Sequence, residues 1–264
     1  MNQKLNMKHH SYRKHTARQA MTLIELLVVI SIIGVLAGLI LPAVGNVKKK
    51  ARDVQAKKDM ADIKGAISVY QHDYSRLPAS QAAGTVVNAA NQSSDFTFGT
   101  TGSGYGTNIY NNNNVGYQDG NRELMVILTT SSYAGYTPHA SVQNDLRNPR
   151  KTGYFNAKSS GSSGATAGKG LGTDGVMRDP WGNPYVIALD LNYDGWVSNS
   201  VYNHNTLNNG VTPATGLVRQ GAASTHTWAL KDSVMIFSFG ADGSFDTGTQ
   251  ANVEPNKDNV LSWK

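Results

Sequence analysis

Oxygen-bearing side chains recur at every second position of one short segment of the chain. Asp190, Asn192 and Asp194 alternate with apolar or aromatic residues, and Gly195 follows. In calcium loops, oxygens at the first, third and fifth positions bind the ion, and a glycine at the sixth permits the turn. The usual glutamate of the twelfth position is missing, because Val201 stands there. The pattern therefore indicates either a calcium loop or a solvated turn.

A single carboxylate, Glu25, stands near the start of an apolar run that continues to Val44. An ionised carboxylate within a bilayer costs at least a few kcal/mol. In a bundle of identical helices, the free amine of a neighbouring chain would pair with it and remove two desolvated charges at once. The alternative is that Glu25 lies at the depth of the lipid headgroups and is solvated.

The apolar run must form the element that positions Glu25. Residues 26–44 are long enough for a helix to cross a hydrocarbon core at about 1.5 Å per residue. The twenty preceding residues contain no acid, so the positive-inside rule places this end in the cytoplasm and the bulk of the chain outside. Their cations are Lys4, Lys8, Arg13, Lys14 and Arg18.

The small residue suited to cleavage lies before the apolar run. A secretory signal has its cleavage site after the apolar region, whereas Ala20 and Met21 precede it here. Cleavage between them would keep the membrane span on the mature protein. Glu25 would then be the fifth residue, about one helical turn from the new α-amino group.

Residues 20–30, with the sequence AMTLIELLVVI, resemble the cleavage and methylation motif of type IV pilins and type II secretion pseudopilins. The resemblance implies cleavage by a prepilin peptidase after Ala20, N-methylation of Met21, and assembly through Glu25 and Pro42. The usual motif has Gly before the scissile bond and Phe after it, so both cleavage positions depart from the pattern.

Three later segments are similar to the major pseudopilin of type II secretion: residues 179–189, 233–243 and 257–263. The resemblance implies calcium binding by the loop after the strand at 233–239, through Asp242 and Asp246. A plain Asp-Gly turn is the alternative. The chain has no cysteine, so bound metal or assembly would have to replace the disulfides common in exported domains.

The expected fold is α+β: a long N-terminal helix packed on a small antiparallel sheet with long loops. Residues 1–20 form the leader, 21–45 the transmembrane and assembly helix, and 46–264 a pilin-like head. Within the head, apolar residues recur every three or four positions over 46–77, which predicts an amphipathic helix ended by Pro78. Insertions are expected at about 79–178 and 199–231, with a helix at 122–128.

Composition excludes several classes of function. The formal net charge is +6, but the leader supplies five of these charges. Seven of the remaining cations lie just past the span, between Lys48 and Lys64, where lipid headgroups explain them better than nucleic acid does. The chain contains no HExxH, GxSxG or GK[ST] motif, so we expect no enzyme.

The sequence therefore predicts a structural subunit of a type II secretion pseudopilus or related filament. Its expected partners are prepilin peptidase, further copies of itself, other pseudopilins and the secretion machinery. It would be a single-pass protein of the inner membrane, with the head in the periplasm and calcium as cofactor. The alternatives are a type IV pilin with a head decorated for adhesion and a membrane-tethered glycan-binding module.

Overall fold

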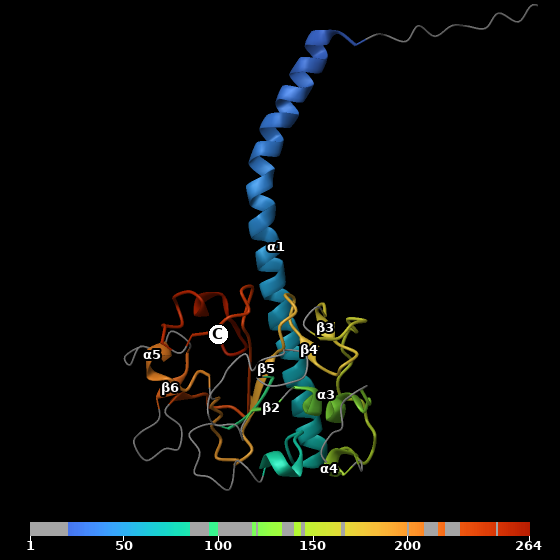
Figure 1. Cartoon of the computed structure of the whole chain (residues 1–264), viewed down its shortest axis with the longest axis vertical. Coiled ribbons are helices and arrows are strands. Elements are labelled where there is room, and N and C mark those ends of the chain that lie inside the picture. Colours follow the sequence, from blue (N-terminus) through green and yellow to red (C-terminus); the bar gives the residue numbers. More distant parts are fainter. Residues whose placement is uncertain are drawn as a thin grey trace, which may run out of the picture. The chain divides into compact units, whose positions relative to one another are not determined.

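The computed structural model describes residues 21–84, 95–99, 118–119, 121–133, 140–143, 146–164, 167–199, 201–208, 216–219, 228–246 and 248–264. The chain divides into two compact units, Met1–Lys48 and Lys49–Lys264. Helix α1 (Leu23–Tyr74) contributes to both (Figure 1). The leader, with Ala20, lies outside the described residues.

Helix α1 begins at a capping box formed by Thr22 and Glu25. The Thr22 N–H and hydroxyl both donate to Glu25 Oε2 at 2.7 Å, and the Glu25 N–H donates to Thr22 Oγ1 at 3.3 Å. This reciprocal arrangement satisfies N–H groups that have no partner inside the helix. Glu25 therefore has a local role in starting the helix.

The first part of α1 is apolar on all sides, as predicted. By length and composition, α1 is able to cross a membrane, and its described side chains between Leu23 and Leu39 are exposed. A Cβ atom added at Gly34 or Gly38 would meet nothing within 4 Å. Pro42 lies within α1, and its side chain is outside the described part of the chain.

The second part of α1 is amphipathic, and its apolar face is buried in the head. The fully buried residues on this face follow the helical period and are Ala56, Met60, Ile63, Ile67 and Tyr70. The helix ends at Tyr74, three residues before the predicted end at Leu77. Ser75 adopts a left-handed conformation with φ 52°, which stops the helix before Pro78 is reached.

The head is built on a five-stranded sheet with the order β2-β1-β5-β8-β9. Its strands are β1 (Phe96–Phe98), β2 (Gln118–Asp119), β5 (Val186–Leu189), β8 (Val234–Ser238) and β9 (Val260–Leu261). All neighbouring strands are antiparallel except β1 and β2, which are parallel. The predicted α+β class is confirmed.

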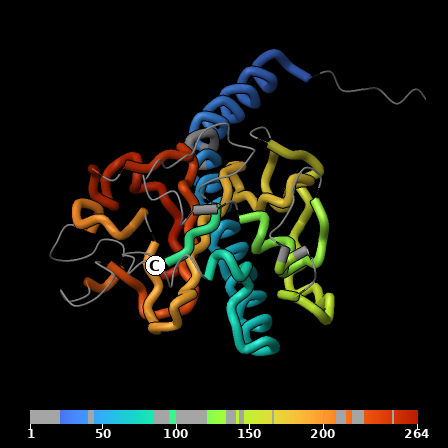
Figure 2. The backbone as a smooth tube through the Cα atoms, turned by 60° about the horizontal axis from the view of Figure 1, so that its bottom comes forward, coloured from blue at the N-terminus to red at the C-terminus, as the bar shows by residue number. Residues whose placement is uncertain are grey.

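Shorter elements surround this sheet. The two-stranded ribbons are β3 (Gly170–Leu171) with β4 (Met177–Arg178), and β6 (Val218–Arg219) with β7 (Trp228–Ala229). The helices are α3 (Arg122–Thr129), α4 (Ala140–Gln143), α5 (Asn205–Asn208) and η1 (Asn256–Asp258). Figures 1 and 2 show α3, β3 and β4 on one side of the head and α5, β6 and the C-terminus on the other.

Alternation along the central strands divides the core into two layers. Ile187 and Ile236 belong to the cluster that contains the buried face of α1. Val186 and Phe237 belong to the second cluster, with Tyr202 and Trp228. Successive side chains of a strand point to opposite faces, so the sheet covers α1 with one face and the C-terminal part of the head with the other.

The region between residues 79 and 178 contributes to the core. The predicted helix at 122–128 is present as α3, and its Leu124 and Leu128 are fully buried against the α1 cluster. The buried Asn121 side chain donates to the Tyr185 and Met177 carbonyls and accepts the Met177 N–H. Although nothing in the sequence related this region to a pilin head, part of it completes the packing around α1.

Candidate functional sites

Three carboxylates from the C-terminal segment converge on one point of the head. Asp242 lies in the turn after β8, Glu254 precedes η1, and Asp258 ends η1. Their oxygens lie within 4.8 Å of one another. Asp242 and Glu254 are exposed and Asp258 is half-buried. We call these three residues the tail triad.

Asp258 is held in place by the loop that it faces. Its Oδ2 accepts the N–H groups of Ala241 at 2.7 Å and Asp242 at 3.1 Å. Its Oδ1 is buried and has no hydrogen-bond partner among the described residues. Burial raises the pKa of Asp258, and the charges of Asp242 and Glu254 add to the shift. A buried acceptor oxygen beside two further carboxylates suits a hard cation, which prefers oxygen ligands.

The turn can approach Asp258 this closely because residue 240 is glycine. Gly240 has φ +71°, and a Cβ atom there would lie 2.3 Å from the Asp258 carbonyl oxygen. The Gly240 carbonyl accepts the Asn183 side-chain amide at 2.9 Å. The turn is thereby joined to residues 179–189, the second of the four segments in which the sequence resembles a pseudopilin.

Asp179 organises that second segment. Its Oδ1 accepts the backbone N–H groups of Trp181, Gly182 and Asn183, and its Oδ2 accepts the hydroxyl of Ser238 at the end of β8. Burial raises the pKa of Asp179 to about 6, although these hydrogen bonds oppose the shift. Asp179 therefore links the turn at residues 180–183 to the end of β8.

Asp246, predicted to act with Asp242, lies outside the tail triad. Its side chain accepts the Gly248 N–H at 2.9 Å and the Thr249 hydroxyl, and its own N–H donates to Asn256 Oδ1. Its carboxylate is thus engaged in its own turn. The triad instead includes Glu254, which no spacing pattern in the sequence predicted as a ligand.

The predicted loop at Asp190 is closed by its own acidic side chains. Asp190 Oδ1 accepts the Asp194 N–H at 3.2 Å and Asp190 Oδ2 accepts the Gly195 N–H at 3.0 Å. Asn192 Oδ1 also accepts the Asp194 N–H. The three predicted oxygen ligands are therefore gathered in one tight loop directly after β5.

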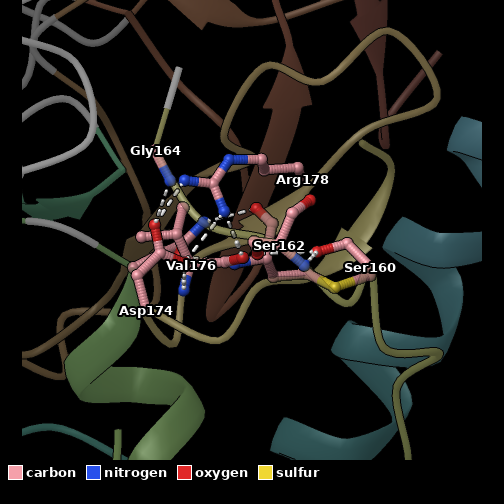
Figure 3. Close-up of polar contacts among 8 residues, drawn as sticks. Ser160, Ser162, Gly164, Asp174, Val176 and Arg178 are labelled. Atoms are coloured by element: carbon pink, nitrogen blue, oxygen red, sulfur yellow. Dashed lines mark hydrogen bonds and ion pairs between the residues drawn. The ribbon is translucent and has the colours of Figure 1, made fainter. Parts of the chain in front are cut away.

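A buried ion pair holds the β3–β4 ribbon (Figure 3). Arg178 Nη1 and Nη2 donate to the two oxygens of Asp174 at 3.0 and 2.6 Å, and the two side chains are 0% and 10% exposed. Burial alone would raise the pKa of Asp174, but the hydrogen bonds from Arg178, Gly164 and Val176 outweigh it and lower the pKa to about 2. This bidentate pair is structural, since it ties the ribbon to the loop at Gly164.

Comparison with known protein families finds a match at the N-terminus. The model of the prokaryotic N-terminal methylation motif matches residues 16–41. The chain carries a prepilin-type N-terminus. This prepilin motif includes Ala20, Met21 and Glu25, together with the capping box that starts α1.

Three curated proteins that are similar to this chain are core proteins G of type II secretion systems. The protein from Klebsiella pneumoniae is 38% identical over 64 residues, 24% of this chain and 46% of the relative. That from Pectobacterium carotovorum subsp. carotovorum is 37% identical over 73 residues, 27% and 47% of the two chains. That from Aeromonas hydrophila is 37% identical over 60 residues, 23% and 42%. The chain thus matches less than half the length of these relatives. No solved structure matches it.

Proposed function

We propose that this protein is a structural subunit of a type II secretion pseudopilus, assembled through its N-terminal helix. The observation that carries the proposal is the prepilin motif at residues 16–41, placed at the start of an apolar helix that is able to span a membrane. The one acid in this apolar part of α1, Glu25, stands beside the predicted new N-terminus. The similarity to core proteins G supports secretion as the context.

The proposed partners follow from this assembly. Prepilin peptidase would remove the leader, and further copies of the chain would pack their N-terminal helices together. Other pseudopilins and the secretion machinery would complete the filament. By the positive-inside rule, the leader cations would keep the first residues in the cytoplasm and the head would lie in the periplasm. The chain would then be anchored in the inner membrane until it joins the filament.

Leader removal is the first prediction. In cells that contain prepilin peptidase, mass spectrometry of the membrane fraction should find a terminus at N-methyl-Met21, because Ala20 adds only one methyl group to the usual Gly. Cells without the peptidase should retain Met1, which serves as the control. An intact Met1 terminus in the presence of active peptidase would contradict the proposal.

We also propose that the tail triad binds calcium. Asp242, Glu254 and Asp258 would supply the carboxylate ligands, and the ion would neutralise three converging charges. It would also join the segment after β8 to η1. This C-terminal segment has few large apolar groups that could order it without an ion. The buried Asp258 Oδ1 without a described partner supports the assignment.

Chelation tests this calcium site. A ligand that binds only the folded state adds ~2.7 kcal/mol of stability at a hundredfold excess over its dissociation constant, which corresponds to several degrees in Tm for a chain of this size. The full chain in detergent should therefore melt several degrees lower in chelator. Asp242→Ala and Glu254→Gln should shrink this difference, whereas Asp246→Ala should not. If chelator lowers the Tm of wild type and of Asp242→Ala by the same amount, the tail triad does not bind the metal.

A further inference from the structure

The loop after β5 faces an acid that is distant in sequence. Strands β1 and β5 are antiparallel, with Phe96 opposite Leu189. One residue further along each strand, the same register places Asp95 opposite Asp190. Directly opposite residues point to the same face of a sheet, and like charges in such pairs are destabilising. A cation bound between two acids at this position would therefore be stabilising.

Two hydrogen bonds join Asp95 to Ser198 at the far end of the loop. The Asp95 N–H donates to the Ser198 carbonyl at 2.9 Å, and the Ser198 N–H donates to Asp95 Oδ2 at 2.9 Å. Asp95 is 0% exposed. Burial raises its pKa to about 8, and the negative charges of Asp190 and Asp194 add to the shift. The buried carboxylate thus lies in the field of both acids of the loop.

The hydroxyl of Ser198 is a buried oxygen in the same part of the loop. Ser198 is 0% exposed, and its Oγ finds no hydrogen-bond partner within the part of the chain that the structure describes. Only three bonds separate the Oγ and N atoms of a serine, so this hydroxyl is close to the N–H that contacts the Asp95 carboxylate. Counted from Asp190, Ser198 is the ninth residue, a position that supplies a ligand in calcium loops.

We propose that this loop is a calcium site separate from the tail triad, with Asp95 in place of the missing twelfth-position glutamate. The side-chain ligands would be Asp95, Asp190, Asn192, Asp194 and Ser198. The Trp196 carbonyl occupies the seventh position, where calcium loops use a backbone oxygen. A cation here would neutralise the facing acids and fasten the start of β1 to the end of β5.

The geometry also predicts a small closure on binding. Among the described residues, the tail triad is the only group that brings three acidic side chains within 4.8 Å. The oxygens of Asp95, Asp190 and Asp194 are therefore further apart than an ion would hold them, and calcium would draw them together. This calcium site does not depend on assembly into a filament. A negative result for the site would therefore not count against the filament, and the reverse also holds.

Terbium luminescence tests the site, because Trp196 lies within the loop and can sensitise an ion bound there. The full chain in detergent would carry Asp242→Asn and Glu254→Gln to remove the tail triad. We expect tryptophan-sensitised luminescence that calcium displaces and that Trp196→Phe strongly reduces. Asp95→Asn and Asp194→Asn should each weaken binding by at least about tenfold.

The controls separate loss of a ligand from loss of the fold. Asp194 is exposed, so Asp194→Asn tests the loop even if Asp95→Asn does not fold. Asp62→Asn, on the exposed face of α1, should leave the terbium affinity unchanged. The proposal would be overturned if the chain with Asp242→Asn and Glu254→Gln gave no luminescence that calcium displaces. It would also be overturned if Asp95→Asn and Asp194→Asn both left the terbium affinity unchanged.

Discussion

Glu25→Gln and Glu25→Ala are both expected to abolish filaments while leaving membrane insertion and leader removal intact. In the assembled helices, either change leaves the amine of Met21 without its carboxylate. Loss of one partner of an ion pair that assembly has buried is strongly destabilising, and this loss would recur in each association step. Electron microscopy of filaments sheared from cells measures the effect, and the amount of processed chain in the membrane provides the reference.

The two substitutions separate assembly from local capping. Glutamine can take the place of glutamate in a capping box, so Glu25→Gln keeps the contact with Thr22 and removes only the charge. Alanine removes both. Normal filaments from Glu25→Gln, with none from Glu25→Ala, would mean that Glu25 acts by starting α1 and that its charge plays no part in assembly.

Arg178→Met is expected to lower the free energy of unfolding by about 3–5 kcal/mol, because it leaves the buried Asp174 carboxylate without its cation. Urea unfolding of the full chain in detergent measures the change. The matched control is Lys58→Met, which removes an exposed ion pair with side chains 64% and 51% exposed. Exposed ion pairs contribute little to stability, so a similar loss in both variants would contradict the structural role of Arg178.

The same ion pair predicts a pH dependence. The pKa of Asp174 is lowered to about 2 in the folded chain, from an ordinary value of 3.8. Its contribution, about 2 kcal/mol, is therefore present above pH 4 and is lost as the pH falls toward 2. Asp174→Leu combined with Arg178→Met should remove this dependence and recover much of the stability at neutral pH. A double variant as unstable as Arg178→Met alone would speak against this account.

The sequence was most informative where the pattern was local and periodic. The apolar run before Val44 and the helical spacing from Ala56 to Tyr70 predicted α1. Short continuous apolar runs, at 185–189 after a Pro- and Gly-containing turn and at 233–239, predicted β5 and β8. The oxygen spacing at Asp190 predicted a loop, and the structure places those side chains together. In each case, residues that act together are close in sequence, so spacing alone brings them to one place.

The remaining features depend on contacts between distant segments. Glu254 comes close to Asp242 because the chain returns at η1, and the register of β1 on β5 places Asp95 opposite Asp190. The earlier end of α1 follows from the left-handed conformation of Ser75, which serine seldom adopts. Neither long-range pairing nor an unusual φ angle leaves a recognisable period in the sequence.

Disulfide cross-linking between copies tests the filament most directly, because the natural chain contains no cysteine. A chain with Val35→Cys and Val47→Cys, both exposed on α1, would be oxidised in membranes with and without prepilin peptidase. Assembly through parallel N-terminal helices predicts a ladder of dimers, trimers and longer oligomers only when the leader has been removed. Processed chains that remain monomers or stop at dimers would contradict a subunit that polymerises through this helix.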